Sequence, residues 1–344
     1  MDRRTLLRTV PAAIATAALP RALRAQEATL RLHQFLPPIS TIPAGVLKPW
    51  GERLAAASDG RISVRHFDAM ALGGRPPELL DQARDGVVDL SMSLVGYTPG
   101  RYPRSEVFEL PFMMSDPVAT SLAFWEMVET DFQRNEFADL KVLGAWVHGP
   151  GVIHTRAPLT RLEDMRGRTL RGPTRMITRL LGELGATPIG MPVPAVPEAL
   201  SKGVIEGTVI PWEVTAGLRI AELVRNHTEF TGPEALYTAT IVLAMNRARY
   251  ASLPDELRAV VDAESGAKLS AFAAQVMQAA DAPAREIAEK AGNAIHRLDA
   301  AEVARWKEAS APVVARWIEE QEAAGIDARA LIARARALIA ANRA

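Results

Sequence analysis

Short apolar segments typical of strands alternate along this chain with amphipathic segments typical of helices, and this alternation constrains the fold more than any other feature. The segments Thr29–Gln34, Arg61–Phe67 and Val88–Leu94 have the composition of strands. Between them, Pro43–Ser58 and Pro76–Asp85 have helical patterning. Strands that alternate with helices are typical of an α/β fold, in which helices cover a largely parallel sheet.

The middle of the chain continues the same pattern. A long helix expected over residues 116–134 is followed by a strand at Lys141–Val147, which runs into the glycine and proline cluster His148–Gly151. Such a cluster marks a turn or a crossing point. The strands expected beyond it are Val152–Thr155, Arg168–Arg171, Thr187–Ile189, Ile205–Ile210 and Tyr237–Asn246, and the helices are Thr174–Leu184 and Val196–Lys202.

The last part of the chain is expected to be helical. From Asp255 onward it is rich in alanine, with an interruption near Asn293–Leu298. A length of 344 residues suggests two domains. A helix over Ala263–Ala291 is long enough to lie across both of them as a strut.

Composition excludes several classes of protein. Lys plus Arg and Asp plus Glu both number 40, so no net charge attracts nucleic acid. The absence of cysteine excludes disulfides, thiolate metal sites and a cysteine nucleophile. The six histidines do not cluster in the sequence, and His148 and His154 lack the spacing of metal ligands on a helix. We therefore expect no metal site and no cofactor, and whether a cation accompanies a bound ligand stays open.

The first 25 residues have the pattern of an export signal. Arg3, Arg4 and Arg8 precede the apolar run Val10–Leu19, which is too short to span a bilayer. The adjacent arginines resemble a twin-arginine signal, with an ordinary Sec signal as the alternative. We expect residues 1–25 to be removed on export to the periplasm, and no other run is apolar enough for insertion into a membrane.

A candidate ligand-binding residue lies in the segment LEDMRGRTLRGP, Leu162–Pro173. The segment has the pattern of a helical turn and a strand that stops at Gly172, because proline has no N–H for a strand ladder. Arg171 then lies at the carboxyl end of a strand, where open α/β sheets bind their ligands. Its planar guanidinium matches a carboxylate with two parallel hydrogen bonds. The position of Arg171 favours the binding of an organic acid as ligand. The alternative is that Arg171 forms a salt bridge at the protein surface.

Four segments of the chain resemble the solute-binding proteins of tripartite ATP-independent periplasmic (TRAP) transporters, the DctP family. They are VFELPFM at Val107–Met113, LEDMRGRTLRGP at Leu162–Pro173, PVPAVPEALSKGVIEGTVIPW at Pro192–Trp212 and MNRARYASLPDELRAVV at Met245–Val261. The resemblance extends over nearly all of residues 28–300. It implies a non-catalytic binding protein in which the arginine at the place of Arg171 pairs with the carboxylate of the ligand.

The resemblance also implies a fold and partners. The fold is an α/β, two-lobed periplasmic binding protein (type II-like) with a central cleft, a β-strand hinge and long C-terminal helices. We expect residues 26–149 and 238–276 to form the first lobe and residues 150–237 and 277–344 the second, with Tyr237–Asn246 returning the chain to the first lobe. The lobes would close around the ligand. The loaded protein would deliver it to the small and large subunits of a TRAP membrane permease.

Two departures from the family pattern bear on the ligand. Many members carry a second arginine in the stretch that here is GPGVIHT, Gly149–Thr155, where proline or glycine takes its place. Many also carry an asparagine where Ile210 stands in this chain. Apolar surroundings cannot satisfy additional ligand carboxylates, so the two changes predict a small organic acid with one carboxylate and an apolar or aromatic body.

The remaining candidates for ligand contact lie at expected strand ends and in the loops beside them. Trp212 would form an apolar wall or stack on an aromatic ligand, and Glu213 would accept a hydrogen bond from a ligand hydroxyl or amine. The alternative for Trp212 is a tryptophan buried in the core. The alternative for Glu213 is an acidic residue at a helix N-terminus, where the helix dipole favours a negative charge. The other candidates are Phe35, Met92, Ser93, Tyr97, His148, Pro173 and Asn246.

No catalytic motif occurs in the chain: there is no GxSxG elbow, no P-loop and no GxGxxG after a strand. We therefore expect a binding protein and not an enzyme. The alternatives are a ligand-sensing partner of a membrane receptor, a binding protein of an ATP-driven importer and, less favoured, a periplasmic enzyme that would use Glu213 with His148.

Overall fold

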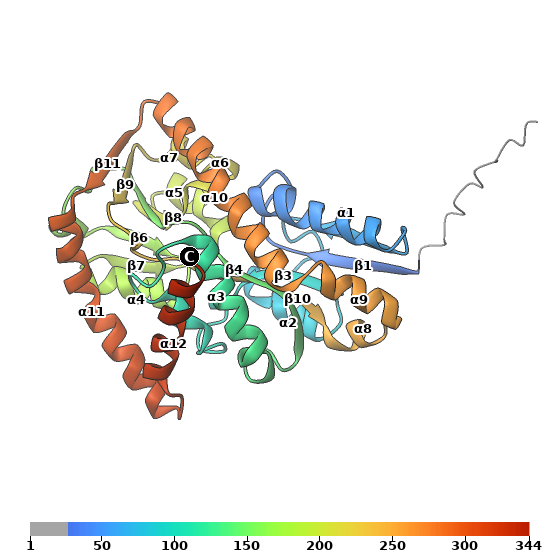
Figure 1. Cartoon of the computed structure of the whole chain (residues 1–344). Helices are drawn as coiled ribbons and strands as arrows, with labels where there is room; N and C mark the ends of the chain where they lie inside the picture. Colours follow the sequence, from blue (N-terminus) through green and yellow to red (C-terminus); the bar gives the residue numbers. More distant parts are fainter. Residues whose placement is uncertain (1–26, 344) are drawn as a thin grey trace, which may run out of the picture.

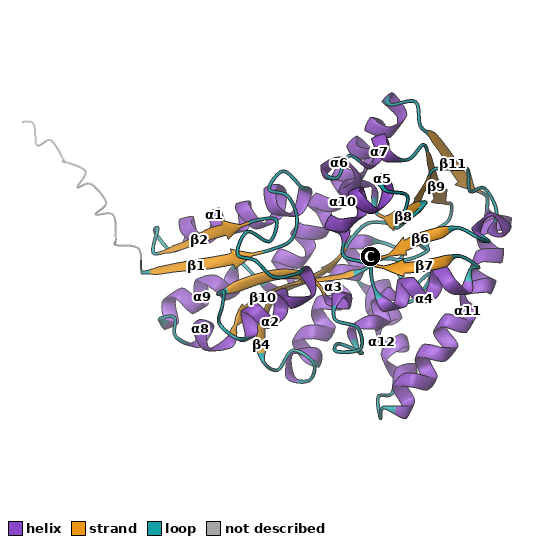
Figure 2. Ribbon diagram, turned by 180° about the vertical axis from the view of Figure 1, so that it is seen from behind, coloured by secondary structure: helices purple, strands orange, loops and turns teal. Residues whose placement is uncertain are grey.

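The computed structural model describes residues 27–343, so the expected signal peptide over residues 1–25 lies outside the described residues. Two β-sheets with helices packed on them lie one beside the other and form two lobes (Figure 1, Figure 2). The two-lobed α/β fold expected from the sequence is confirmed.

The first sheet has the strand order β2-β1-β3-β10-β4. Its strands are β1 (Ala28–His33), β2 (Ile62–Phe67), β3 (Leu90–Leu94), β4 (Leu140–Val147) and β10 (Thr240–Asn246). Strand β1 pairs in parallel with β2 and β3, whereas β10 is antiparallel to β3 and β4. The carboxyl ends of β1, β3 and β4 therefore lie at one edge of the sheet, and the carboxyl end of β10 lies at the opposite edge.

The second sheet has the strand order β11-β9-β5-β8-β6-β7. Its strands are β5 (Val152–Thr155), β6 (Thr169–Gly172), β7 (Thr187–Gly190), β8 (Gly207–Ile210), β9 (Asn226–Phe230) and β11 (Ala294–Leu298). Strand β6 is parallel to both of its neighbours, β7 and β8. Neither β9 nor β11 is among the strands expected from the sequence. Most of β11 is not buried, so its side chains give only a weak apolar pattern.

The helices cover the faces of the two sheets and connect their strands. The α-helices are α1 (Lys48–Ala57), α2 (Leu79–Arg84), α3 (Pro117–Thr130), α4 (Arg175–Glu183), α5 (Val196–Ser201), α6 (Trp212–Gly217), α7 (Ile220–Leu223), α8 (Arg247–Ala251), α9 (Asp255–Ala263), α10 (Gly266–Lys290), α11 (Ala300–Ala323) and α12 (Ala328–Ala341). The shorter turns are η1 (Ile42–Leu47), η2 (Pro76–Glu78), η3 (Val95–Tyr97), η4 (Ser105–Glu109), η5 (Phe132–Arg134), η6 (Leu162–Met165) and η7 (Val193–Ala195). Within residues 27–343, none of the helices is both long and apolar enough to cross a bilayer.

Between β1 and β11, the chain passes between the lobes through two strand connections and one long helix. Strand β4 continues into β5 through His148–Gly151, and the segment after β9 leads into β10, which returns the chain to the first sheet as predicted. Helix α10 packs against β4 and α3 of the first lobe and against α6 of the second, so the predicted strut is present (Figure 1).

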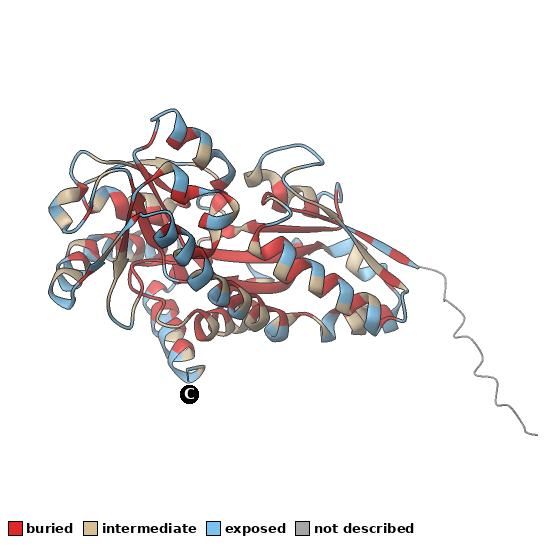
Figure 3. Ribbon diagram, turned by 90° about the horizontal axis from the view of Figure 1, so that it is seen from above, coloured by how far each residue is buried: buried red, intermediate tan, exposed pale blue. Residues whose placement is uncertain are grey.

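The two C-terminal helices lie on different lobes. Helix α11 packs against α4, whereas α12 packs against α3, and Arg334 of α12 donates to Thr130 of α3 at 2.6 Å. The expected grouping of all of residues 277–344 with the second lobe does not describe α12. The residue limits of the lobes stay a prediction. The strands between the helices are mostly buried, whereas the outer faces of the helices are exposed (Figure 3).

A buried chain of hydrogen bonds holds the end of β8 beside the cleft. Nε2 of His154 lies 3.1 Å from the carbonyl oxygen of Ile210, and Nδ1 of His154 lies 2.7 Å from Nδ1 of His227. A carbonyl oxygen can only accept, so Nε2–H of His154 donates to it and Nδ1 of His154 accepts from Nδ1–H of His227. Two histidines that are distant in the sequence thus meet in the fold.

Both imidazoles are neutral in the folded protein. Burial lowers the pKa of His154 well below its ordinary value of 6.5 and lowers the pKa of His227 to about 4. Below pH 6.5 the unfolded chain takes up protons that the folded protein does not bind. The stability that the pair contributes is therefore complete above pH 6.5 and is lost as the pH falls toward 4.

We expect that replacing both His154 and His227 by glutamine makes stability less dependent on pH. Urea unfolding at about pH 7.5 and about pH 5.5 should show a difference in unfolding free energy that is smaller than in the wild type by about 1.4 kcal/mol for each histidine. Groups that titrate elsewhere are present in both proteins and cancel in this comparison. An equal difference in the two proteins would contradict the neutral state of the pair.

Candidate functional site

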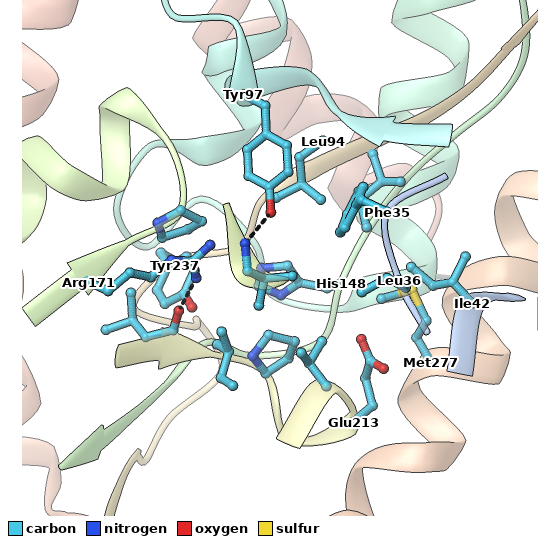
Figure 4. Close-up of a pocket in the computed structure, with 17 residues that line it drawn as sticks. Phe35, Leu36, Ile42, Leu94, Tyr97, His148, Arg171, Glu213, Tyr237 and Met277 are labelled. Carbon is cyan, nitrogen blue, oxygen red and sulfur yellow. Dashed lines mark hydrogen bonds between the residues drawn. The ribbon is translucent and has the colours of Figure 1, made fainter. Parts of the chain in front are cut away.

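A cavity lies between the two lobes (Figure 4). The second lobe lines it with the ends of β6 and β8, the turn η7 and the first turn of α6. The first lobe lines it with the segment after β1, the end of β3, η3 and β10. Its surface is mostly apolar, and the polar side chains that line it are Tyr97, His148, Arg171, Glu213 and Tyr237.

Arg171 is held at the cavity by the two strands that flank β6. Its Nε donates to the carbonyl oxygen of Met191, directly after β7, at 2.8 Å, and its Nη1 donates to that of Val209 in β8 at 3.2 Å. Arg171 is 1% exposed, and its guanidinium lies beside the hydroxyl of Tyr97, but its Nη2 has no partner in good hydrogen-bond geometry among residues 27–343. Burial lowers the pKa of Arg171, and its attraction to Tyr97 and Tyr237 opposes this change. The residue is therefore a buried cation at a strand end, and not part of a surface salt bridge.

Tyr237 is a second buried donor at the same end of the cavity. It is 1% exposed, interacts electrostatically with Arg171, and its hydroxyl group has no partner among the described residues. Its ring lies against Gly151, where an added Cβ would come within 2.0 Å of the ring. Gly151 belongs to the stretch in which many family members carry a second arginine. The tyrosine ring therefore occupies space that a side chain at Gly151 would need.

Aromatic and proline side chains form one wall of the cavity. The rings of Phe35 and Tyr97 lie 5.3 Å apart between centroids, and Pro173 follows directly after β6. The backbone N–H of Val193 in η7 donates to the hydroxyl oxygen of Tyr97 in η3 at 2.9 Å, which joins the two lobes across the cleft. The structure thus brings these three candidates together in one cavity.

His148 lines the cavity as a neutral acceptor. Burial lowers its pKa to about 4, and its Nδ1 lies 2.6 Å from the carbonyl oxygen of Gly149. Nδ1–H donates to that oxygen, so Nε2 is the acceptor that remains.

Glu213 lines the cavity from the first turn of α6. It is 4% exposed, and its Oε1 has no hydrogen-bond partner among the described residues. Burial raises the pKa of Glu213 to about 8, and the charge of Asp281 raises it as well. A hydrogen bond with Thr41 opposes this increase. The backbone N–H of Glu213 donates to Oδ1 of Asp281 at 2.9 Å, and burial raises the pKa of Asp281 to about 7. The Glu213 carboxyl is therefore mostly protonated at neutral pH.

Trp212 does not line the cavity, contrary to the expectation from the sequence. Its indole packs against His154 and His227, with ring centroids 5.2 and 4.9 Å apart, and its Nε1 donates to Glu229 at 2.9 Å. Consecutive residues of a helix point in directions about 100° apart, so Glu213 faces the cavity while Trp212 faces the second sheet. The core alternative for this tryptophan is the correct one.

Three further candidates lie away from the cavity. Met92 is buried in the core of the first lobe, and the hydroxyl of Ser93 donates to backbone carbonyl groups. Strand β3 extends one residue further, to Leu94, and Leu94 is the residue of β3 that lines the cavity. Asn246 lies at the opposite edge of the sheet, because β10 is antiparallel to β3. Its side chain donates to Ala83 and caps α8.

Tyr237 and most of the apolar lining residues are not among the ligand contacts expected from the sequence. The proline or glycine in place of the family arginine is the one signal for Tyr237, since it frees space that another side chain must fill. The apolar lining residues cannot be distinguished by pattern from core residues, and they are Leu36, Ile42, Leu94, Val193, Val209, Ile210, Pro211, Val214, Ile241 and Met277. In residues 27–343, no group of three or more His, Cys, Asp or Glu side chains is arranged to hold a metal ion.

Comparison with solved structures shows close similarity to TRAP solute-binding proteins. One from Rhodoferax ferrireducens T118, in complex with copurified benzoate, is 46% identical, with a TM-score of 0.90 over 92% of this chain and 98% of that one. One from a marine metagenome, described as specific for aromatic acid ligands and bound to 3-hydroxybenzoate, is 43% identical, with a TM-score of 0.90 over 92% and 99% of the chains. One from Bordetella bronchiseptica with bound (R)- and (S)-mandelate is 30% identical, with a TM-score of 0.84 over 91% and 98%.

The model of the DctP family, described as bacterial extracellular solute-binding protein, family 7, matches residues 33–321. This range includes both sheets except the first residues of β1, and it includes every residue that lines the cavity. The resemblance seen in the sequence is confirmed, and this chain belongs to family 7 of the bacterial extracellular solute-binding proteins, the DctP family.

Proposed function

We propose that this protein binds an aromatic monocarboxylate in the cavity between its lobes and delivers it to a TRAP membrane permease. The observation that carries the proposal is a pair of buried donors, Nη2 of Arg171 and the hydroxyl of Tyr237, which line one apolar cavity without a partner among the described residues. A ligand carboxylate would accept a hydrogen bond from both.

Arg171 supplies the charge that selects an acid. A buried guanidinium without a counter-ion is costly, and an anion bound beside it removes much of that cost. Two of its nitrogens already donate to backbone carbonyl groups, which fix the direction of the third. Tyr237 then provides a second donor for the carboxylate. Burial raises the pKa of Tyr237, so its hydroxyl keeps its proton.

The rest of the cavity supports a ligand with one carboxylate. Tyr237 fills the space beside Gly151, which belongs to the stretch in which many family members carry a second arginine, and Ile210 takes the place of a polar asparagine. A second ionised carboxylate would lose its hydration there without gaining a cation. Phe35 and Tyr97 offer aromatic faces, against which a ring packs favourably.

The ligands of related proteins agree with this chemistry. The relatives that are 46%, 43% and 30% identical to this chain contain benzoate, 3-hydroxybenzoate and mandelate, respectively. Each of these is an acid with one carboxylate and one aromatic ring. We infer that this protein takes a ligand of the same class.

Contacts across the cleft support a mechanism of closure around the ligand. Val193 binds Tyr97 as described above, and the hydroxyl of Thr174 beside β6 donates to Glu109 of η4 at 2.7 Å. At Gly96 the lobes lie so close that an added Cβ would be 2.5 Å from Thr174. The ligand's own contacts with both lobes would supply the free energy of closure. The closed, loaded protein would then dock, as a carrier without catalytic activity, on the small and large permease subunits after export to the periplasm.

We expect aromatic monocarboxylates to stabilise the purified protein. Benzoate, phenylacetate and mandelate should raise the melting temperature, since a ligand at about a hundredfold excess over its dissociation constant adds about 2.7 kcal/mol to the stability. Succinate and malate should have little effect. A thermal-shift screen measures this directly. Stabilisation by the dicarboxylates and not by the aromatic acids would contradict the proposal.

Variants at the carboxylate end of the cavity should lose affinity in a graded way. We expect Arg171→Met to weaken binding of benzoate by about two to three orders of magnitude, because the carboxylate would be buried without a cation. Tyr237→Phe removes only the hydroxyl and keeps the ring against Gly151, so it should cost about tenfold. Titration calorimetry gives both values, and circular dichroism checks the fold. Wild-type affinity in Arg171→Met would refute the assigned role of this residue.

A further inference from the structure

The cavity has a second polar end, which a simple aromatic acid would leave unused. Glu213 is 4% exposed, and Figure 4 shows its carboxyl group turned toward the interior of the cavity, on the other side from Arg171. Its Oε1 is buried and has no hydrogen-bond partner among residues 27–343. A buried polar atom without a partner is costly to the protein, so its presence in a binding cavity indicates that a ligand group reaches it.

The position of this carboxyl group is fixed by the fold. Glu213 lies in the first turn of α6, directly after Pro211 and Trp212, and its backbone N–H is bonded to Asp281 of α10. The packing of Trp212 between two histidines holds the start of the helix in place. The backbone of Glu213 is therefore fixed beside the cavity, and its side chain is buried there and not exposed at the surface.

The electrostatic surroundings of Glu213 indicate which ligand group it accepts. The groups that shift its pKa besides burial are Thr41 and Asp281, and neither is a cation. A second carboxylate on the ligand would lose its hydration beside a buried carboxyl group, with no cation there to compensate its charge. A phenolic hydroxyl is neutral and donates one hydrogen bond, so it satisfies the carboxyl oxygen without adding charge.

We propose that the preferred ligand is a hydroxyl-substituted aromatic acid, and that Glu213 determines this specificity by accepting a hydrogen bond from the ring hydroxyl at the end of the cavity opposite Arg171. This inference rests on the proposed function, since it uses the same cavity with the carboxylate at Arg171. It adds a specificity residue that binds the far side of the ring.

One other acceptor lines the same cavity. Nε2 of His148 is unprotonated, because Nδ1–H donates to Gly149. A ring hydroxyl in a different position would reach His148 instead of Glu213, so the test has to separate the two residues.

The test combines three ligands with three proteins. Benzoate, 3-hydroxybenzoate and 4-hydroxybenzoate are titrated by calorimetry into the wild type, Glu213→Gln and Glu213→Leu. The wild type should bind one hydroxybenzoate at least about tenfold more tightly than benzoate, since a site built to bond a hydroxyl discriminates against the analogue without it. Glu213→Leu should lose this preference, so that its affinities for benzoate and for the same hydroxybenzoate differ by less than about threefold. Glu213→Gln keeps an acceptor oxygen of the same reach and should retain part of the preference.

The outcomes separate this inference from the proposed function. If benzoate binds and neither hydroxybenzoate is preferred by the wild type, the inference is wrong and the proposed function stands. If the preference persists unchanged in Glu213→Leu, another residue such as His148 binds the hydroxyl and the inference is again wrong. If no aromatic acid binds the folded wild type, the proposed function and this inference are both wrong.

Discussion

A guanidinium group buried at the end of an inner strand is the constraint on which the rest of this site depends. Strand β6 lies between β7 and β8, which are both parallel to it. Nε of Arg171 donates to the carbonyl oxygen of the residue directly after β7, and Nη1 donates to a carbonyl oxygen of β8. The sheet therefore fixes the direction of the one nitrogen that has no partner among the described residues. A positive charge so placed cannot rearrange to find water, and its environment favours a bound anion.

The closed arrangement of the lobes follows from the same geometry. The cavity lies between the two sheets, next to the strand connections and α10. Each lobe contributes part of its lining. Tyr237 lies in the segment that leads into β10, so the second donor of the carboxylate site comes from the hinge itself. A ligand that bonds both Arg171 and Tyr237 thus links the second lobe to the hinge, which couples binding to closure.

The sequence predicts the fold and the position of Arg171 well, and the details of the cavity poorly, for physical reasons. Strand–helix alternation and the proline after Gly172 are local signals, and they place Arg171 correctly. Asn246 is misplaced because the direction of β10 is a property of the whole sheet and not of its own residues. Trp212 and Glu213 are adjacent, and only the orientation of α6 decides which one faces the ligand. The pairing of His154 with His227 depends on β5 and β9 lying side by side, which spacing does not reveal.

The crystal structure of the protein with bound benzoate is the measurement that tests the central claim most directly. The account predicts carboxylate oxygens at about 2.7–3.2 Å from both Nη2 of Arg171 and the hydroxyl of Tyr237, with the ring against Phe35 and Tyr97. A benzoate bound with its carboxylate turned away from Arg171, with water on Nη2, would contradict it.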